Sequence, residues 1–281
     1  MTEVKPLDLN TLSEKIIEIS KCAGKEILAV YNDKDGFGIE TKSDDSPVTK
    51  ADIAANKVIV AMLEKLTPEI PVLTEETSLV PFSERQHWPR YWIVDPLDGT
   101  KEFINRNDEF TVNIALIEKH SPVMGVVYVP VTDVTYVGVS GHGAHKLQGE
   151  NKQNISCRTA NSNGNGIEVV ASKRHLSEET QRFIDAVAHD LGTVSTKSVG
   201  SSLKFCLLAE GLADVYPRFA PTSEWDTAAA QAVLCAAGGK VLKRDMNELD
   251  YNAKENILNP DFFAVADTKV NWNSVLQQLE S

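Results

Sequence analysis

Hydrophobic residues recur every three or four positions in the N-terminal part of the chain, which is the spacing of an amphipathic helix. Residues 8–31 carry this pattern, with Asn10 as the expected N-cap, and residues 50–66 carry it again after Thr49. The segment 32–47 between them is rich in glycine, aspartate and proline. The pattern therefore predicts two helices joined by an irregular segment.

The next part of the chain favours β-structure. Short apolar runs at 70–73 and 91–94 each end in acidic residues, and longer runs follow at 111–118, 123–129 and 134–139. Turn residues separate the three longer runs, which predicts an antiparallel meander.

Strands and helices alternate beyond a Gly/Asn/Ser loop at 161–166. Expected strands cover 167–171, 213–216, 240–242 and 262–266, expected helices cover 178–189, 202–210 and 226–237, and residues 270–279 close the chain. We expect an N-terminal α+β half, residues 1–155, and a C-terminal α/β half, residues 156–281.

Composition narrows the class of protein. The chain has 281 residues, 42% of them hydrophobic, which is enough for a sizeable core, and no apolar run is long enough to span a bilayer. Acidic residues outnumber basic ones by 40 to 28, so sequence-independent nucleic-acid binding is disfavoured. The N-terminus lacks the apolar segment of a secretory signal, and the four cysteines form no CxxC unit. A cytoplasmic protein with reduced thiols fits these observations.

The segment 92–100, Trp-Ile-Val-Asp-Pro-Leu-Asp-Gly-Thr, carries the clearest chemical signal. An apolar strand delivers Asp95 and Asp98 into a tight turn, and Gly99 permits a close approach of a ligand to the backbone. A helix beginning after Thr100 would point free N–H groups at the same place. Carboxylate oxygens suit Mg²⁺, and N–H groups suit phosphate. Taken alone, the segment is also compatible with an ordinary surface turn.

Two further acidic positions favour a metal site over a plain turn. Glu75 and Glu76 end another apolar strand, and Asp226 opens a helix of small residues directly after Trp225. Carboxylates from three segments are what a multi-metal site needs. A phosphoaspartyl mechanism of the haloacid-dehalogenase type fits poorly, because two residues rather than one separate Asp95 from Asp98.

These motifs resemble the inositol monophosphatase superfamily, a group of lithium-sensitive, Mg²⁺-dependent phosphatases. The resemblance rests on Glu75-Glu76, residues 92–100, Trp225-Asp226 and the Ala-Ala-Gly-Gly run at 236–239. Residues 101–115, 200–206 and 213–219 look like the bacterial 3'(2'),5'-bisphosphate nucleotidase branch, because inositol phosphatases usually have Thr-Asn-Phe where this chain has Lys-Glu-Phe at 101–103. The resemblance implies a layered α/β/α/β/α sandwich.

The resemblance also implies roles for individual residues. Metal ligands would be Glu75, Asp95, the Leu97 carbonyl, Asp98 and Asp226, holding two or three Mg²⁺ ions. Asp52 and Thr100 would orient and deprotonate the attacking water, and Glu76 would lie outside the ligand shell or hold a third metal ion. Substrate contacts would come from Gly99, Thr100, His175, Ser201, Lys204 and Arg218. Taken singly, Lys204 also fits a solvated helix face, and His175 also fits a surface or capping role.

Three functions compete at this point. The first is hydrolysis of adenosine 3',5'-bisphosphate to AMP and phosphate, which would support sulfur assimilation. The second keeps the chemistry but takes inositol monophosphate or a sugar phosphate. The third is a non-catalytic protein that binds nucleotides or metals, which the complete set of acidic and hydroxyl positions disfavours. The resemblance is compatible with a monomer or a homodimer, and with peripheral attachment to the inner membrane, although no basic amphipathic helix argues for that attachment.

Overall fold

The computed structural model describes residues 6–33, 36–41, 47–161, 164, 166–171 and 177–279. Its helices are α1 Leu9–Tyr31, α2 Lys50–Leu66, α3 Phe82–Arg85, α4 Thr100–Ile104, α5 Glu178–Leu191, α6 Leu203–Ala209, α7 Glu224–Ala236 and α8 Trp272–Leu279. Its strands are β1 Glu40–Thr41, β2 Pro47–Val48, β3 Val72–Thr74, β4 Arg90–Asp98, β5 Thr111–Glu118, β6 Ser121–Val129, β7 Val134–Val139, β8 Gly143–Gln148, β9 Asn151–Ile155, β10 Ile167–Val170, β11 Val194–Lys197, β12 Val215–Arg218, β13 Lys240–Lys243 and β14 Phe262–Val265.

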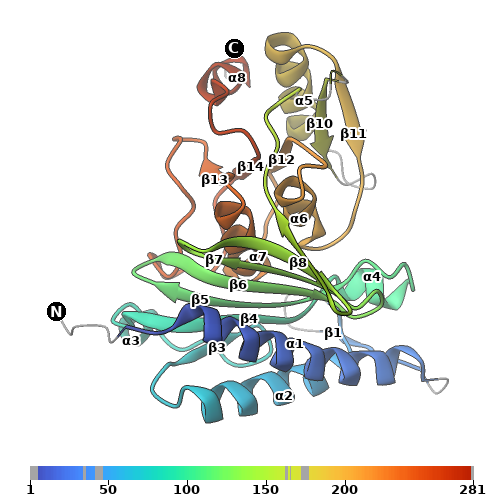
Figure 1. Ribbon diagram of the computed structural model, residues 1–281, viewed down its shortest axis with the longest axis vertical. Helices are drawn as coiled ribbons and strands as arrows, with labels where there is room; N and C mark the ends of the chain where they lie inside the picture. The colour runs from blue at the N-terminus through green and yellow to red at the C-terminus, as the bar shows by residue number, and fades with distance from the viewer. Residues whose placement is uncertain are drawn as a thin grey trace.

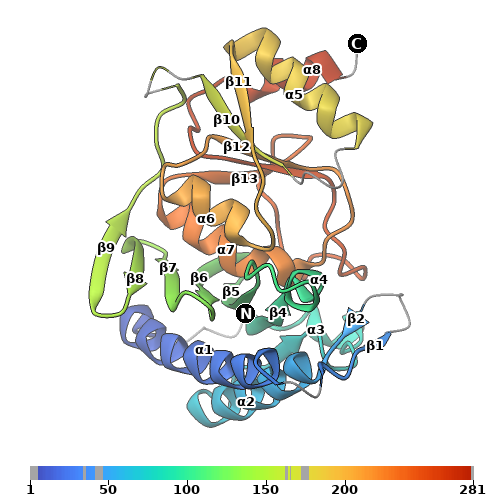
Figure 2. The same cartoon turned by 90° about the vertical axis from the view of Figure 1, so that its right-hand side faces the viewer.

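The elements stack in five layers, α/β/α/β/α (Figure 1). Helices α1 and α2 cover the outer face of a seven-stranded sheet in the order β3-β4-β5-β6-β7-β8-β9. Helices α6 and α7 lie between that sheet and a five-stranded sheet in the order β11-β10-β12-β14-β13. Helices α5 and α8 close the opposite side (Figure 2). The layered sandwich implied by the motifs is confirmed.

Helix α7 fixes the distance between the two sheets. Small residues form most of its buried face, and it lies on β6 and β7 where these strands carry Gly125 and Gly138. A Cβ atom at either glycine would collide with the backbone of α7. The glycines therefore let the helix rest directly on the sheet, which places its N-terminus beside the end of β4.

Most predicted elements are present, with shifts at their ends. The N-cap of α1 is Asp8 rather than Asn10, because the Asp8 carboxylate accepts the free N–H groups of residues 10 and 11. The meander is confirmed and continues through β8 and β9, which sequence reasoning missed along with β11. Residue polarity explains the omission, since β9 and β11 are largely exposed. The division of the chain at residue 155 stays a prediction.

No helix in the described part of the chain is long and apolar enough to cross a lipid bilayer.

Candidate active site

Glu75 and Asp95 lie side by side because their strands are parallel neighbours. Strands β3 and β4 pair so that Thr74 faces Val94, and the Glu75 N–H donates to the Val94 carbonyl at 3.2 Å. The chain therefore places both acids at the same edge of the sheet. Asp95 is buried, whereas Glu75 remains partly exposed.

A bulge brings Asp98 to the same side as Asp95. Residues three apart on a regular strand point to opposite faces of the sheet. Strand β4 breaks its register here, since Asp95 pairs with Asn113 but Asp98 pairs with Thr111 on β5. The extra residue in β4 turns Asp98 back toward the cavity that Asp95 also lines. With Pro96 and Leu97 between them, the two aspartates therefore face the same side only because the strand is bulged at this point.

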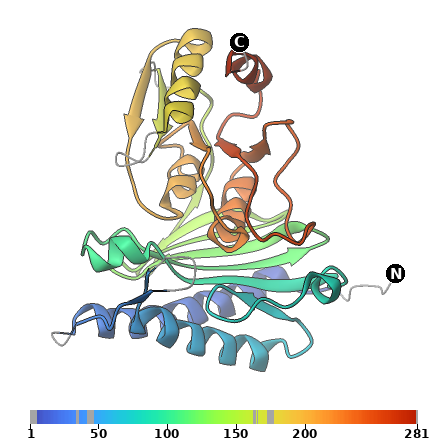
Figure 3. The same ribbon diagram turned by 180° about the vertical axis from the view of Figure 1, so that it is seen from behind.

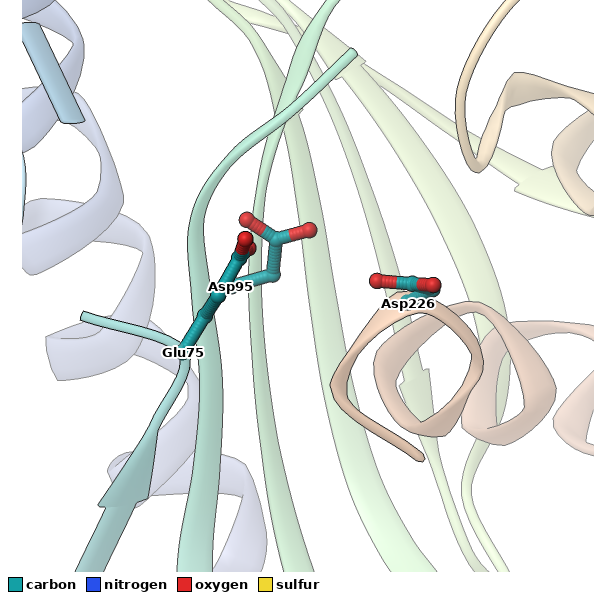
Figure 4. A group of neighbouring side chains, drawn as sticks. All are labelled: Glu75, Asp95 and Asp226. Carbon is teal, nitrogen blue, oxygen red and sulfur yellow. The ribbon is translucent and has the colours of Figure 1, made fainter. Parts of the chain in front are cut away.

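Asp226 reaches the same place from the other half of the molecule. It is the third residue of α7, and its carboxylate accepts the Ser223 N–H at 2.8 Å in a capping box. Oxygen atoms of Glu75, Asp95 and Asp226 all lie within 4.8 Å of one another. Figure 4 shows Asp226 facing the other two carboxylates across the gap.

The electrostatics of this cluster fit a divalent cation. Burial raises the pKa of Asp95 well above its usual range, and the charges of Glu75 and Asp98 raise it further. Burial and the Asp98 charge likewise raise the pKa of Asp226. Hard carboxylate oxygens that repel one another in a buried site are the donor set that Mg²⁺ prefers. The residues present therefore fit the metal implied by the motifs.

Asp52 and Thr100 form the predicted pair next to this cluster. The Thr100 hydroxyl donates to Asp52 Oδ1 at 3.1 Å, although the two residues are 48 positions apart. The other carboxylate oxygen of Asp52 accepts the Thr49 N–H and hydroxyl at 2.7 and 2.6 Å, which caps α2. Burial raises the pKa of Asp52, and these hydrogen bonds oppose that shift. Sequence analysis anticipated Thr49 as the cap but not its bond to Asp52.

Gly99 has a conformation that favours glycine. Its φ is 93° and ψ is 41°, in the left-handed region, and a Cβ atom there would lie 3.1 Å from the Glu109 carbonyl oxygen. Helix α4 begins at the next residue, Thr100, slightly earlier than the sequence predicted. The Leu97 carbonyl accepts the Thr100 hydroxyl at 3.3 Å, and its role as a metal ligand stays a prediction. The same holds for Glu76, which is partly exposed.

Two residues that hold Asp98 were not assigned from the sequence. Asp98 Oδ2 accepts the N–H and the hydroxyl of Ser202 at 2.6 and 2.7 Å, and the Asn113 amide lies 3.4 Å away. The Ser202 hydroxyl also lies 3.0 Å from the Asp226 carbonyl oxygen. Both residues stand inside motifs quoted above, but a polar residue in a motif does not reveal its partner.

Two cavities meet at this site. One, of about 410 Å³, is lined by Glu75, Asp95, Leu97 and Thr100. The other, of about 510 Å³, is lined by Ser201, Lys204, Tyr216 and Arg218. Six residues line both cavities: Asp98, Gly99, Lys101, Glu102, Thr222 and Asp226. The carboxylate cluster therefore opens into a larger space that carries cationic side chains.

Lys204 is buried, so the alternative interpretation that it lies on a solvated helix face is wrong. Only 8% of its surface is exposed, its ammonium donates to the Ser201 carbonyl at 3.1 Å, and it lies 5.6 Å from the centre of the Tyr216 ring. Arg218, the last residue of β12, donates to the Ala220 and Pro221 carbonyls at 3.2 and 3.0 Å. Ordered cations of this kind suit recognition of an anion.

Two predicted substrate-contacting residues remain, Ser201 and His175. Ser201 lines the larger cavity, whereas His175 lies outside the described residues. Lys101 and Glu102, from the segment 101–103 that the sequence linked to substrate choice, line the larger cavity too. Sequence reasoning did not assign three further polar residues of its lining: Asn105, Asn107 and Glu109. Their spacing carried no periodic signal, because they lie at the end of the short helix α4 and in the loop after it.

Comparison with known proteins places the chain in one family. The model of the inositol monophosphatase family matches residues 8–279. The chain is 49% identical over 249 residues to the 3'(2'),5'-bisphosphate nucleotidase CysQ of Salmonella typhimurium, covering 89% of this chain and 97% of that protein. It is 47% identical over 249 residues to the protein of the same name from Escherichia coli K12, with the same coverage of both chains.

A solved structure shows the same fold. The crystal structure of CysQ from Bacteroides thetaiotaomicron, a bacterial member of the inositol monophosphatase family, superposes with a TM-score of 0.81 at 43% identity. The match covers 93% of this chain and 99% of that one. The chain belongs to the inositol monophosphatase family.

Proposed function

We propose that this protein is a Mg²⁺-dependent phosphomonoesterase that converts adenosine 3',5'-bisphosphate to AMP and phosphate, and so supports sulfur assimilation. The observation that carries the proposal is the pair of connected cavities, one lined by carboxylates and the other by Lys204 and Arg218. A substrate with two phosphates needs both environments, one for the reacting phosphate and one for the phosphate that stays. The identity to bisphosphate nucleotidases supports the same substrate.

Glu75, Asp95, the Leu97 carbonyl, Asp98 and Asp226 would hold the metal. Bound Mg²⁺ would supply Lewis-acid stabilisation of the phosphate charge and would make a water molecule easier to deprotonate. Ser202 and the capping box of α7 hold two of these carboxylates in place before substrate binds. The acids are therefore ordered by hydrogen bonds that the reaction does not need to form.

Asp52 and Thr100 would act on the attacking water. The Thr100 hydroxyl donates to Asp52 Oδ1, so its oxygen is free to accept a proton from water on the cavity side. The water oxygen forms the new bond to phosphorus while its proton passes to the Asp52–Thr100 pair. The bond from phosphorus to the ribose 3'-oxygen breaks, and that oxygen takes up a proton from solvent water to become the 3'-hydroxyl of AMP. This route needs no covalent intermediate with the protein. The N–H groups at the start of α4 would bind the phosphate oxygens beside Gly99 and Thr100.

Lys204, Arg218 and Ser201 would select the substrate. Arg218 is held by two backbone carbonyls and Lys204 by one, so their positions are set before the ligand arrives. A 5'-phosphate in the larger cavity would meet these charges, whereas inositol monophosphate has no second phosphate to place there. We extend the proposal to a cytoplasmic location, supported by four free cysteines, which are typical of a reducing compartment.

The test is phosphate release from adenosine 3',5'-bisphosphate and inositol 1-phosphate, measured in parallel with Mg²⁺, with and without lithium. We expect strong preference for the bisphosphate, and loss of turnover in an Asp226→Ala variant that remains folded. Preference for inositol 1-phosphate would leave the metal chemistry in place but overturn the roles of Lys204 and Arg218. Metal binding without release from either ester would contradict the catalytic function.

A further inference from the structure

A buried arginine in the connection between β3 and β4 takes no part in the chemistry proposed above. Arg85 ends the short helix α3, which belongs to the connection between β3 and β4. Only 1% of its surface is exposed. Its guanidinium donates to the Asn252 side-chain oxygen and to the Lys254 and Glu255 carbonyls. Burying a guanidinium this deeply is costly unless hydrogen bonds replace those lost to water, and these three contacts do so.

Asn252 links α3 to α7 through hydrogen bonds. Its side-chain amide donates to the Arg85 carbonyl at 2.6 Å, so the two residues bind each other in both directions. Its backbone N–H donates to Glu224 Oε2 at 2.8 Å. Glu224 is fully buried and is the first residue of α7. Figure 3 shows the segment after β13 descending from the upper sheet toward the end of the molecule where α3 lies.

The two ends of this chain of contacts are the two sources of the carboxylates. On one side, the β3–β4 connection that contains Arg85 begins at Glu75 and leads into the strand that carries Asp95. On the other side, Glu224 and Asp226 share the first turn of α7. The segment 252–258 also lies along this turn, since the Glu224 N–H donates to the Ile257 carbonyl at 3.0 Å.

We propose that Arg85 is a positioning residue of the metal site, which acts through Asn252 and Glu224 to set the separation between Glu75 and Asp95 on β3–β4 and Asp226 on α7. The inference rests on the proposed function, because it takes these carboxylates as metal ligands. A rigid spacing matters here since Mg²⁺ demands nearly ideal geometry, and the three acids repel one another without it. The guanidinium fork, rather than its charge alone, makes the three contacts.

The experiment is calorimetric titration of Mn²⁺ into the metal-stripped full-length protein. We compare wild type with Arg85→Lys, which keeps the charge but loses the fork, and with Asn252→Gly. Glycine is chosen to replace Asn252 because the φ of this residue is 52°, which lies in the left-handed region that glycine readily adopts. We expect each variant to weaken Mn²⁺ binding by about tenfold, as changes behind metal ligands do. The KM for adenosine 3',5'-bisphosphate at saturating metal is expected to change less than twofold.

Arg90→Lys is the matched control, because Arg90 lies at the same end of β4 as Arg85 but pairs with Glu118 on β5. It is expected to change Mn²⁺ affinity less than twofold. The double variant of Arg85 and Asn252 is expected to bind Mn²⁺ no more weakly than the weaker-binding single variant, since the two substitutions break the same chain of contacts.

Two outcomes overturn the inference, and they are distinguishable. If wild type binds Mn²⁺ and Asp226→Ala does not, but both test variants bind it like wild type while melting at a lower temperature, Arg85 is purely structural and the proposed function stands. If wild type itself binds no Mn²⁺, the metal site fails and this inference fails with it. Should Arg85→Lys not fold, the Asn252→Gly result decides.

Discussion

The two cavities that meet at Asp98 differ in how their functional side chains are oriented. In the smaller cavity the functional side chains stand at strand ends and in the first turn of α7, and Asp52 in the first turn of α2 reaches them through Thr100; the layered fold brings these segments together. In the larger cavity, Lys204 and Arg218 also stand at a helix start and a strand end, but each is oriented by carbonyl groups two or three residues away in the chain. The difference indicates that the fold itself builds the reaction chemistry, whereas local segments choose the substrate.

The sharpest way to break this comparison is to remove one charge from the smaller cavity. Asp95→Asn is expected to lower kcat by about 10³-fold, because the charge that binds the metal is lost. The metal-free variant is expected to melt no lower than wild type, since Asp95 is repelled by its acidic neighbours. Turnover and thermal unfolding measure the two effects.

The control for that substitution is Asp133→Asn, at an exposed residue that pairs with Lys21. Its turnover is expected to stay within about twofold of wild type. An Asp95→Asn protein that unfolds while the control is stable would show that the acid serves the fold rather than the chemistry.

The next prediction distinguishes the contribution of the Thr100 hydroxyl group from that of the size of the side chain. Thr100→Val keeps the size of the side chain but loses the bond to Asp52, and kcat is expected to fall about 10²-fold with little change in KM. Thr100→Ser restores the hydroxyl and is expected to recover most of the activity. Equal activity in the valine and serine variants would exclude this hydroxyl from the proton transfer.

A substitution in the larger cavity is expected to change choice rather than rate. Lys204→Met keeps the packing against Tyr216 and removes one charge-assisted contact, which is worth roughly a 10- to 100-fold loss in kcat/KM for adenosine 3',5'-bisphosphate. Turnover of adenosine 3'-monophosphate is expected to change less than threefold. Lys240→Met, at an exposed residue that pairs with Glu248, is the control. Equal losses on both substrates would contradict a role in selection.

The smallest expected effect is a pH dependence of the metal-free protein. Burial raises the pKa of Asp226 from 3.8 to about 8, so between these values the folded protein binds more protons than the unfolded chain. Stability is therefore present at low pH and is lost as the pH rises toward 8. We expect the Tm in a chelator to fall by a few degrees between pH 5 and 8, and saturating Mg²⁺ to remove the slope.

Asp226→Asn is expected to flatten the same slope without added metal. Scanning calorimetry with and without the chelator measures both effects. A metal-free Tm that rises between pH 5 and 8 would mean that a partner within the fold stabilises the charged Asp226 carboxylate. That result would contradict a carboxylate whose charge is stabilised only by a bound cation.

Much of the smaller cavity was predictable from the sequence because its residues follow local rules. Acids that end an apolar strand or begin a helix can be recognised along the chain, as with Glu75, Asp95 and Asp226. The resemblance then supplied Asp52 and Thr100, whose contact spans 48 positions. Periodicity predicted α1 and α2, because each buries one regular face. Apolar runs between turn residues predicted the meander, whose strands β5, β6 and β7 are buried on both faces.

What the sequence did not reveal depends on long-range pairing. Ser202 and Asn113 bind Asp98 from positions 104 and 15 residues away, and no local pattern marks them. The sequence analysis assigned no role to Arg85, and only the fold buries it against Asn252, 167 positions later. The polar strands β9 and β11 lacked an apolar face to signal them.

The most direct test of the two-cavity arrangement is a crystal structure of the slow Thr100→Val variant with Mn²⁺ and adenosine 3',5'-bisphosphate, with the metal located by its anomalous scattering. The expected result is Mn²⁺ among Glu75, Asp95 and Asp226, the 3'-phosphate beside it, and the 5'-phosphate against Lys204 and Arg218. A nucleotide bound with its 5'-phosphate away from both cations, or Mn²⁺ bound only to surface acids, would contradict the arrangement.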